Sequence, residues 1–69
     1  MKNWQKIFST TDAFRAELLK GLLEDQQIPA IIINKKDTAY NNFGAQELYV
    51  KKEDLVQALK TIAHEIRTE

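Results

Sequence analysis

The sequence predicts an α+β fold, a ferredoxin-like two-layer sandwich in which two helices cover one face of a three-stranded antiparallel sheet. The first observation behind it is that apolar residues recur at helical spacing in two segments, Asp12–Gln27 and Glu53–Arg67. The second is that short strand-like runs alternate with these segments in the order β-α-β-β-α. The strand-like runs are Trp4–Ser9, Ala30–Asn34 and Gln46–Val50.

The length of 69 residues predicts a single domain, residues 1–69, with a small core. A domain of this size buries only about 60% of the surface that its unfolded chain exposes. Small domains gain stability from disulfides, from a metal or from self-association. The chain has no cysteine and one histidine, so we expect no metal or cofactor, and we predict a homodimer.

Charge and hydropathy exclude two classes of partner. Ten basic residues balance ten acidic ones, whereas binding to nucleic acid depends on an excess of Lys and Arg. The first residues contain no apolar segment of the kind that a signal peptide has. The longest apolar run, Ile28–Ile33, is far shorter than the roughly 20 residues of a membrane span. We therefore expect a cytoplasmic protein that binds neither nucleic acid nor membrane.

The first strand and the first helix have clear local signals. Trp4–Ser9 is rich in aromatic and apolar residues. Thr11 or Asp12 is the expected N-cap of the helix, and Pro29 marks its end. Gly21 interrupts the helix, and we expect it to allow a close approach to the sheet. The expected buried face consists of Phe14, Leu18, Leu19, Leu22 and Leu23.

The remaining strands differ in pattern. Ala30–Asn34 is continuously apolar up to its last residue, which indicates that both of its faces are covered. The third strand alternates in part, with Leu48 and Val50 on one face and Tyr49 on the other. The second helix carries a broad apolar stripe, expected to be buried, formed by Leu55, Val56, Leu59, Ile62, Ala63 and Ile66.

The element order also predicts how the chain assembles. A right-handed crossover places the third strand in the centre and leaves the first strand as an open edge. The helices cover one sheet face, so the isoleucines of the second strand cannot all be covered. Scattered apolar residues are ordinary on protein surfaces, but a patch of them is typical of an interface. We predict dimerisation through the open face or the open edge, with a candidate dimer face of Trp4, Phe8, Ile31, Ile33 and Tyr49.

The connection between the second and third strands, Lys35–Ala45, is long for a hairpin, whose loops usually have 2–5 residues. Its cations, amides and aromatic rings could bind an anionic small metabolite or a partner protein. Alternatively, it is a surface loop whose lysines only end a strand, since no phosphate-binding motif occurs in it. The candidate residues of this loop are Lys35, Lys36, Asp37, Tyr40, Asn42 and Phe43.

No catalytic residues are predicted. His64 falls on the polar side of the second helix, and we expect it to be solvated. No sequence motif pairs a nucleophile with a base. The protein is therefore not expected to be an enzyme.

Several stretches of the chain carry a family resemblance: Ser9–Asp12, Ala16–Glu24, Ile28–Ala30 and Glu47–Val50. With these residues the sequence resembles the family of putative prokaryotic signal-transducing proteins, which is bacterial and has no established reaction. The resemblance implies a PII-like ferredoxin fold and a regulatory, signal-transduction or protein-interaction role. It also implies that the connection between strands two and three serves partners or ligands.

Overall fold

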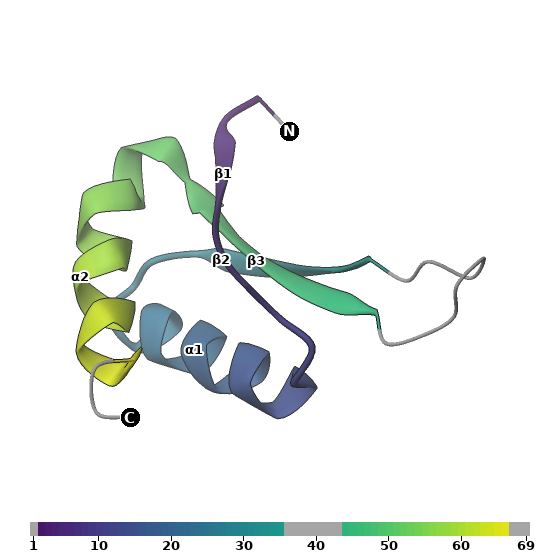
Figure 1. Ribbon diagram of the computed structural model, residues 1–69. Coiled ribbons are helices and arrows are strands. Elements are labelled where there is room, and N and C mark those ends of the chain that lie inside the picture. The colour runs from purple at the N-terminus through teal and green to yellow at the C-terminus, as the bar shows by residue number, and fades with distance from the viewer. Residues whose placement is uncertain (1, 36–43, 67–69) are drawn as a thin grey trace.

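A computed structural model describes residues 2–35 and 44–66 of the chain (Figure 1). The element order is β-α-β-β-α, as predicted, with a short 3₁₀ turn before the second helix. The elements are β1 (Trp4–Thr10), α1 (Ala13–Asp25), β2 (Ala30–Lys35), β3 (Ala45–Lys51), the 3₁₀ turn η1 (Lys52–Asp54) and α2 (Leu55–Ile66).

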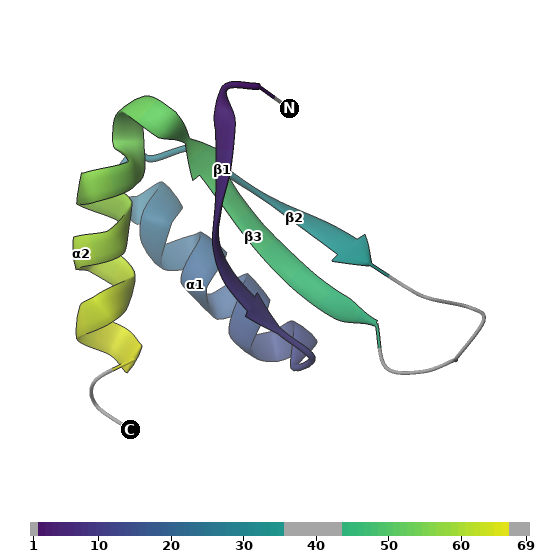
Figure 2. The ribbon, with the colours of Figure 1, turned by 45° about the horizontal axis from the view of Figure 1, so that its top comes forward.

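The three strands form one antiparallel sheet in the order β1-β3-β2. This confirms that the third strand lies in the centre and that β1 is an edge strand. Both helices pack on the same side of the sheet (Figures 1 and 2). The α+β ferredoxin-like prediction is therefore confirmed.

The register of β2 against β3 decides which side chains reach the helices. Ala30 pairs with Val50 and Ile32 pairs with Leu48, and these four residues pack in or against the core. Because side chains alternate along a strand, the residues between them point to the opposite face. The core also contains Leu19, Leu23, Ile28, Ala58 and Ile62.

A β-bulge in β1 changes the face on which Phe8 lies. Lys6 pairs with Tyr49, but Phe8 rather than Ile7 pairs with Leu48, so Ile7 is the extra residue. Without the bulge, simple alternation would place Phe8 opposite Glu47 on the uncovered face. With it, both Ile7 and Phe8 pack against the core. The prediction that Phe8 belongs to the open face is therefore wrong.

Both ends of α1 are fixed by hydrogen bonds. Asp12 is the N-cap, as one of the two predicted alternatives, and its carboxylate accepts from the N–H groups of Phe14 at 3.0 Å and Arg15 at 3.3 Å. At the other end, the N–H of Ile28 donates to the carbonyl of Leu23 at 2.9 Å. This is the Schellman arrangement, and it places Gln27 in the left-handed region at φ 63°. The helix ends at Asp25, before Pro29 is reached.

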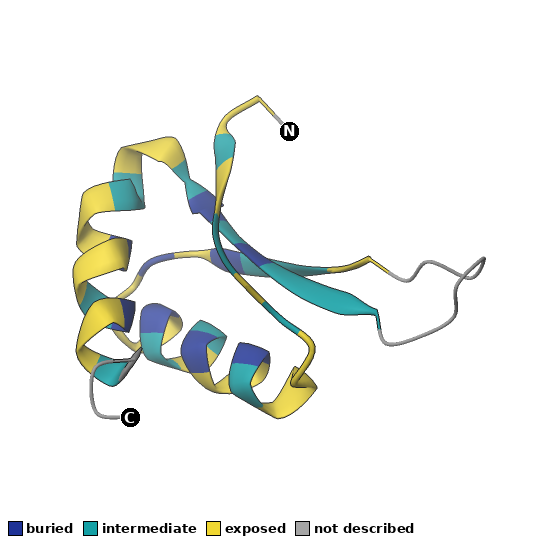
Figure 3. Cartoon of the chain, viewed as in Figure 1, coloured by how far each residue is buried: buried dark blue, intermediate teal, exposed yellow. Residues whose placement is uncertain are grey.

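The buried face of α1 is rotated relative to the prediction (Figure 3). Ala16, Leu19 and Leu23 are buried, whereas Phe14 is 75% exposed and Leu18 is 41% exposed. Leucines at neighbouring positions point in directions about 100° apart, so only one of the two rows can face the sheet. The small side chain of Ala16 completes the row that does.

Gly21 does not serve the predicted close approach. It is exposed, and a Cβ added at this position would meet nothing within 4 Å. The sheet lies on the opposite side of α1, along the row of Leu19 and Leu23. The expected role of Gly21 in packing is therefore wrong.

The predicted apolar stripe of α2 is only partly buried. Ala58 and Ile62 are in the core, but Val56 is 67% exposed and Leu59 is 42% exposed. Ala63 is exposed as well, and the side chain of Ile66 lies outside the described residues. The stripe is thus wider than the surface that the three strands offer. Within residues 2–35 and 44–66, the sheet ends at β1 and no further strand covers the rest of this helix.

Candidate functional site

The sheet face opposite the helices carries the largest group of predicted site residues. Ile31 pairs with Tyr49 across β2 and β3, and Ile33 pairs with Glu47. All four side chains point away from the helices, because their neighbours along each strand face the core. Trp4 lies on the same face at the far end of β1. We refer to Trp4, Ile31, Ile33 and Tyr49 as the open face.

The open face is apolar at its centre and only half covered. Ile31, Ile33 and Tyr49 are half-buried by their neighbours in the sheet, and no described helix or strand lies over them. The prediction that both faces of the second strand are covered therefore holds for one face within the described chain. The structure brings together four of the five residues predicted for a dimer face, and Phe8 is the exception.

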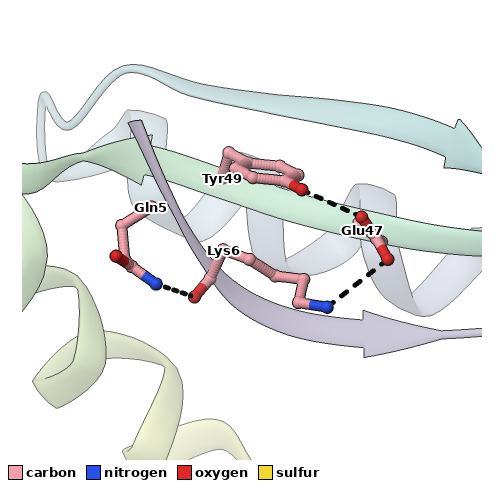
Figure 4. Close-up of polar contacts among 4 residues, drawn as sticks. All are labelled: Gln5, Lys6, Glu47 and Tyr49. Carbon is pink, nitrogen blue, oxygen red and sulfur yellow. Dashed lines mark hydrogen bonds and ion pairs between the residues drawn. The ribbon is translucent and has the colours of Figure 1, made fainter. Parts of the chain in front are cut away.

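Three polar groups form a cluster beside these apolar side chains (Figure 4). The hydroxyl of Tyr49 donates to Oε1 of Glu47 at 2.9 Å. The ammonium of Lys6 lies 3.5 Å from Oε2 of the same carboxylate. The hydrogen bond from Tyr49 lowers the pKa of Glu47 against the opposing effect of desolvation, and the positive charge of Lys6 lowers it further. The same hydrogen bond raises the pKa of Tyr49 above its ordinary value.

This cluster pairs the negative charge of Glu47 on the open face. Glu47 is the acid on this face, and both of its oxygens have a partner. A carboxylate that is already paired costs less to remove from water than a free one. The roles of Lys6 and Glu47 were not predicted from the sequence. Opposite charges on two strands predicted to pair were the available signal, but the pairing needs the register.

The loop predicted to bind a ligand or partner is represented only by its ends. Lys35 ends β2 and is exposed. Lys36, Asp37, Tyr40, Asn42 and Phe43 lie outside the described residues, so the prediction for this loop stays a prediction.

His64 is exposed on α2, as expected. It lines a shallow concavity of about 370 Å³ between α1 and α2, together with Leu22, Asp25, Gln26, Lys60, Thr61 and Glu65. Within residues 2–35 and 44–66, no three His, Asp or Glu side chains come close enough to hold a metal ion.

A second concave site lies at the end of the sheet where β1 begins and β3 ends. It has a volume of about 480 Å³. The N–H of Lys52 donates to the carbonyl of Asn3 at 2.9 Å and holds the two segments together. The site is lined by Asn3, Trp4, Lys51, Lys52 and Glu53.

The described helices contain no segment of the length and apolar character that crossing a lipid bilayer requires.

Comparison with known proteins identifies the family. The family model described as "Putative prokaryotic signal transducing protein" matches residues 4–66. The chain belongs to this family. The match runs from the first residue of β1 to the last residue of α2, so it includes the sheet, both helices and the open face. The family description names signal transduction and no reaction. No curated protein and no solved structure matches the chain.

Proposed function

We propose that this chain is a small regulatory or protein-interaction module of bacterial signal transduction, and that it acts as a homodimer through its open face. The observation that carries the proposal is the group of apolar side chains on a sheet face that no helix covers. The family description supports the signalling role.

The composition of β2 supports the choice of the open face. A strand with apolar side chains on both faces is typical of a sheet covered on both sides. The helices account for Ala30 and Ile32, and a second copy of the chain would account for Ile31 and Ile33. A two-fold axis would place the same patch of both copies in contact. The paired charges of Lys6 and Glu47 would then enter the interface without leaving an isolated charge.

The free edge of β1 is the alternative dimer surface. It lies beside α2, whose exposed Val56 and Leu59 form an apolar flank. A strand added to β1 would pair with its free N–H and C=O groups next to this flank.

Two substitutions that each introduce a lysine separate these surfaces. Ile33→Lys places a charge on the open face, and Val56→Lys places one on the flank of α2. We expect sedimentation equilibrium to show a dimer for the wild-type chain and for Val56→Lys, and a monomer for Ile33→Lys. The reverse pattern would assign the dimer to the edge. A wild-type chain that stays monomeric at concentrations of about 100 μM, far above the Kd of most specific complexes, would overturn the dimer.

A sensor for an anionic metabolite is the second candidate function, and the exposed ammonium of Lys35 at the end of β2 supports it. The double substitution Lys35→Ala and Lys36→Ala should then abolish a metabolite-induced rise in melting temperature. The melting temperature without ligand should be unchanged. If no compound in a panel of anionic metabolites shifts the wild-type melting temperature, this candidate fails.

We also propose a cytoplasmic location and a role without cofactor or catalysis, both of which rest on the sequence alone. Turnover of any substrate in a broad panel would contradict the second part.

A further inference from the structure

We propose that the concave site at the junction of β1, β3 and η1 binds a small organic anion that carries a planar aromatic ring. This site lies at the opposite end of the sheet from the connection between β2 and β3, and it shares Trp4 with the open face. We refer to Asn3, Trp4, Lys51, Lys52 and Glu53 as the junction site.

The sheet register positions the ring-binding part of the junction site. Trp4 pairs with Lys51 across β1 and β3, and residues paired in this way project from the same face of a sheet. Trp4 is half-buried and lines the junction site. An indole offers a flat apolar surface on which another aromatic ring can stack. The volume of about 480 Å³ lies within the range of small-molecule sites.

Two lysines give the site its charge. Consecutive residues of a strand project to opposite faces, but the chain leaves β3 after Lys51 and turns into η1 at Lys52. This turn is the reason that both residues line one concavity. Neither ammonium makes an ion pair with any residue in the described ranges. With Glu53 as the acid in the lining, the side chains of the junction site carry a net positive charge.

A backbone hydrogen bond joins the two segments that form the junction site. The hydrogen bond from the Lys52 N–H to the Asn3 carbonyl fixes the segment before β1 against the start of η1. The backbone positions of Trp4 and the two lysines relative to one another are therefore set by the fold. The amide of Asn3 and the carboxylate of Glu53 can bind a hydroxyl or amino substituent of the ligand. The chemistry of the lining thus suits an aromatic phosphate ester or carboxylate.

The chain has one tryptophan, so a change in its fluorescence on adding ligand at constant protein concentration reports on the residue that the junction site shares with the open face. We would titrate the full chain with phenyl phosphate, and with phenol and inorganic phosphate as probes for the ring and the anion alone. We expect a saturable change in Trp4 emission with phenyl phosphate at a Kd of about 1 mM or lower. Phenol and phosphate should each bind at least about tenfold more weakly, since each lacks one half of the contacts.

Charge-matched variants test the assignment. Lys51→Ala together with Lys52→Ala should weaken binding of phenyl phosphate at least about tenfold, as expected for the loss of two charge-assisted contacts. Lys20→Ala together with Lys60→Ala removes the same charge from the two helices and should leave the affinity unchanged. Trp4→Phe keeps an aromatic ring and should retain a ligand-induced rise in melting temperature, whereas Trp4→Ala should lose it.

Three results would overturn the junction site: no saturable response to phenyl phosphate, equal binding of phenol and phenyl phosphate, or equal loss of binding in both lysine double variants. The titration is repeated with Ile33→Lys, in which the dimer is expected to be disrupted. Retained binding in that variant supports a site complete within one chain, and lost binding contradicts it. Failure of the dimer and failure of the junction site are therefore separate results.

Discussion

Tyr49 donates the hydrogen of its hydroxyl to Oε1 of Glu47 across 2.9 Å, on the sheet face that neither helix covers. The two residues are next but one along β3, so the alternation of the strand places them side by side. Lys6 approaches the other carboxylate oxygen from β1. An apolar face thereby gains an acid without gaining an unpaired charge.

This arrangement predicts how stability changes at low pH. The pKa of Glu47 is lowered from its ordinary value of 4.5 in the folded chain, mainly by the hydrogen bond from Tyr49. The contribution of Glu47 to stability is therefore present above pH 4.5 and is lost as the pH falls through the lowered pKa. In Glu47→Gln this part of the acid-side loss should disappear. Urea unfolding at a series of pH values below neutrality measures it, with the exposed Glu24→Gln on α1 as the matched control.

Tyr49, the donor of that hydrogen bond, predicts a loss of stability at high pH. The pKa of Tyr49 is raised above 10.0 because its neutral hydroxyl donates to Glu47. Its contribution is present below pH 10.0 and is lost as the pH rises through the raised pKa. In Tyr49→Phe the carboxyl resonance of Glu47 should titrate at higher pH than in the wild type, since the bond that lowers its pKa is gone. An unchanged NMR titration of Glu47 would show that the bond does not form in solution.

Gly21 offers a stabilising substitution. It lies in α1 with open space around the position of a Cβ, so Gly21→Ala introduces no clash. Alanine restricts the unfolded chain and favours helix by about 1 kcal/mol relative to glycine. We expect Gly21→Ala to raise the free energy of unfolding by about that amount in urea. A decrease would mean that a partner packs closely against this side of α1, as in a complex.

Gln27 offers a second stabilising substitution, for a different reason. It holds φ 63° in the Schellman turn that ends α1, where an L-residue with a Cβ loses about 1–2 kcal/mol relative to its preferred conformations. Gln27→Gly removes this cost and should stabilise the chain by about 1 kcal/mol or less, because glycine also gains freedom in the unfolded state. Gln27→Val should destabilise it, since a β-branched residue tolerates this conformation poorly. Equal stability of all three chains would contradict the left-handed turn.

The topology could be predicted from the sequence because it depends on the order of elements and on the handedness of crossovers, which local patterns show. The faces of the elements could not be predicted as well. The bulge at Ile7 has no distinct local signal, yet it moves Phe8 from one side of the sheet to the other. The junction site was missed for a related reason, because Trp4 and Lys51 meet only once the register is known.

The predicted buried faces of the helices were wrong where a helix has more apolar residues than its packing surface can cover. In α1 two rows of large side chains compete, and the small residue Ala16 decides which row can approach the sheet. In α2 the stripe extends past the edge strand, so Val56 stays exposed. Periodicity shows that a helix is amphipathic, but the width of the sheet decides how much of the stripe is buried.

The rotated face of α1 leads to a direct test. Phe14 is 75% exposed, so Phe14→Lys should change the free energy of unfolding by no more than about 0.5 kcal/mol, as surface substitutions do. Leu19 is buried in the core, so Leu19→Ala should cost about 2–5 kcal/mol through lost packing and the cavity that remains. Had the row of Phe14 and Leu18 faced the sheet, the two substitutions would rank the other way. Urea unfolding of both variants, measured at one protein concentration so that dimerisation affects them equally, decides which row of α1 supports the fold.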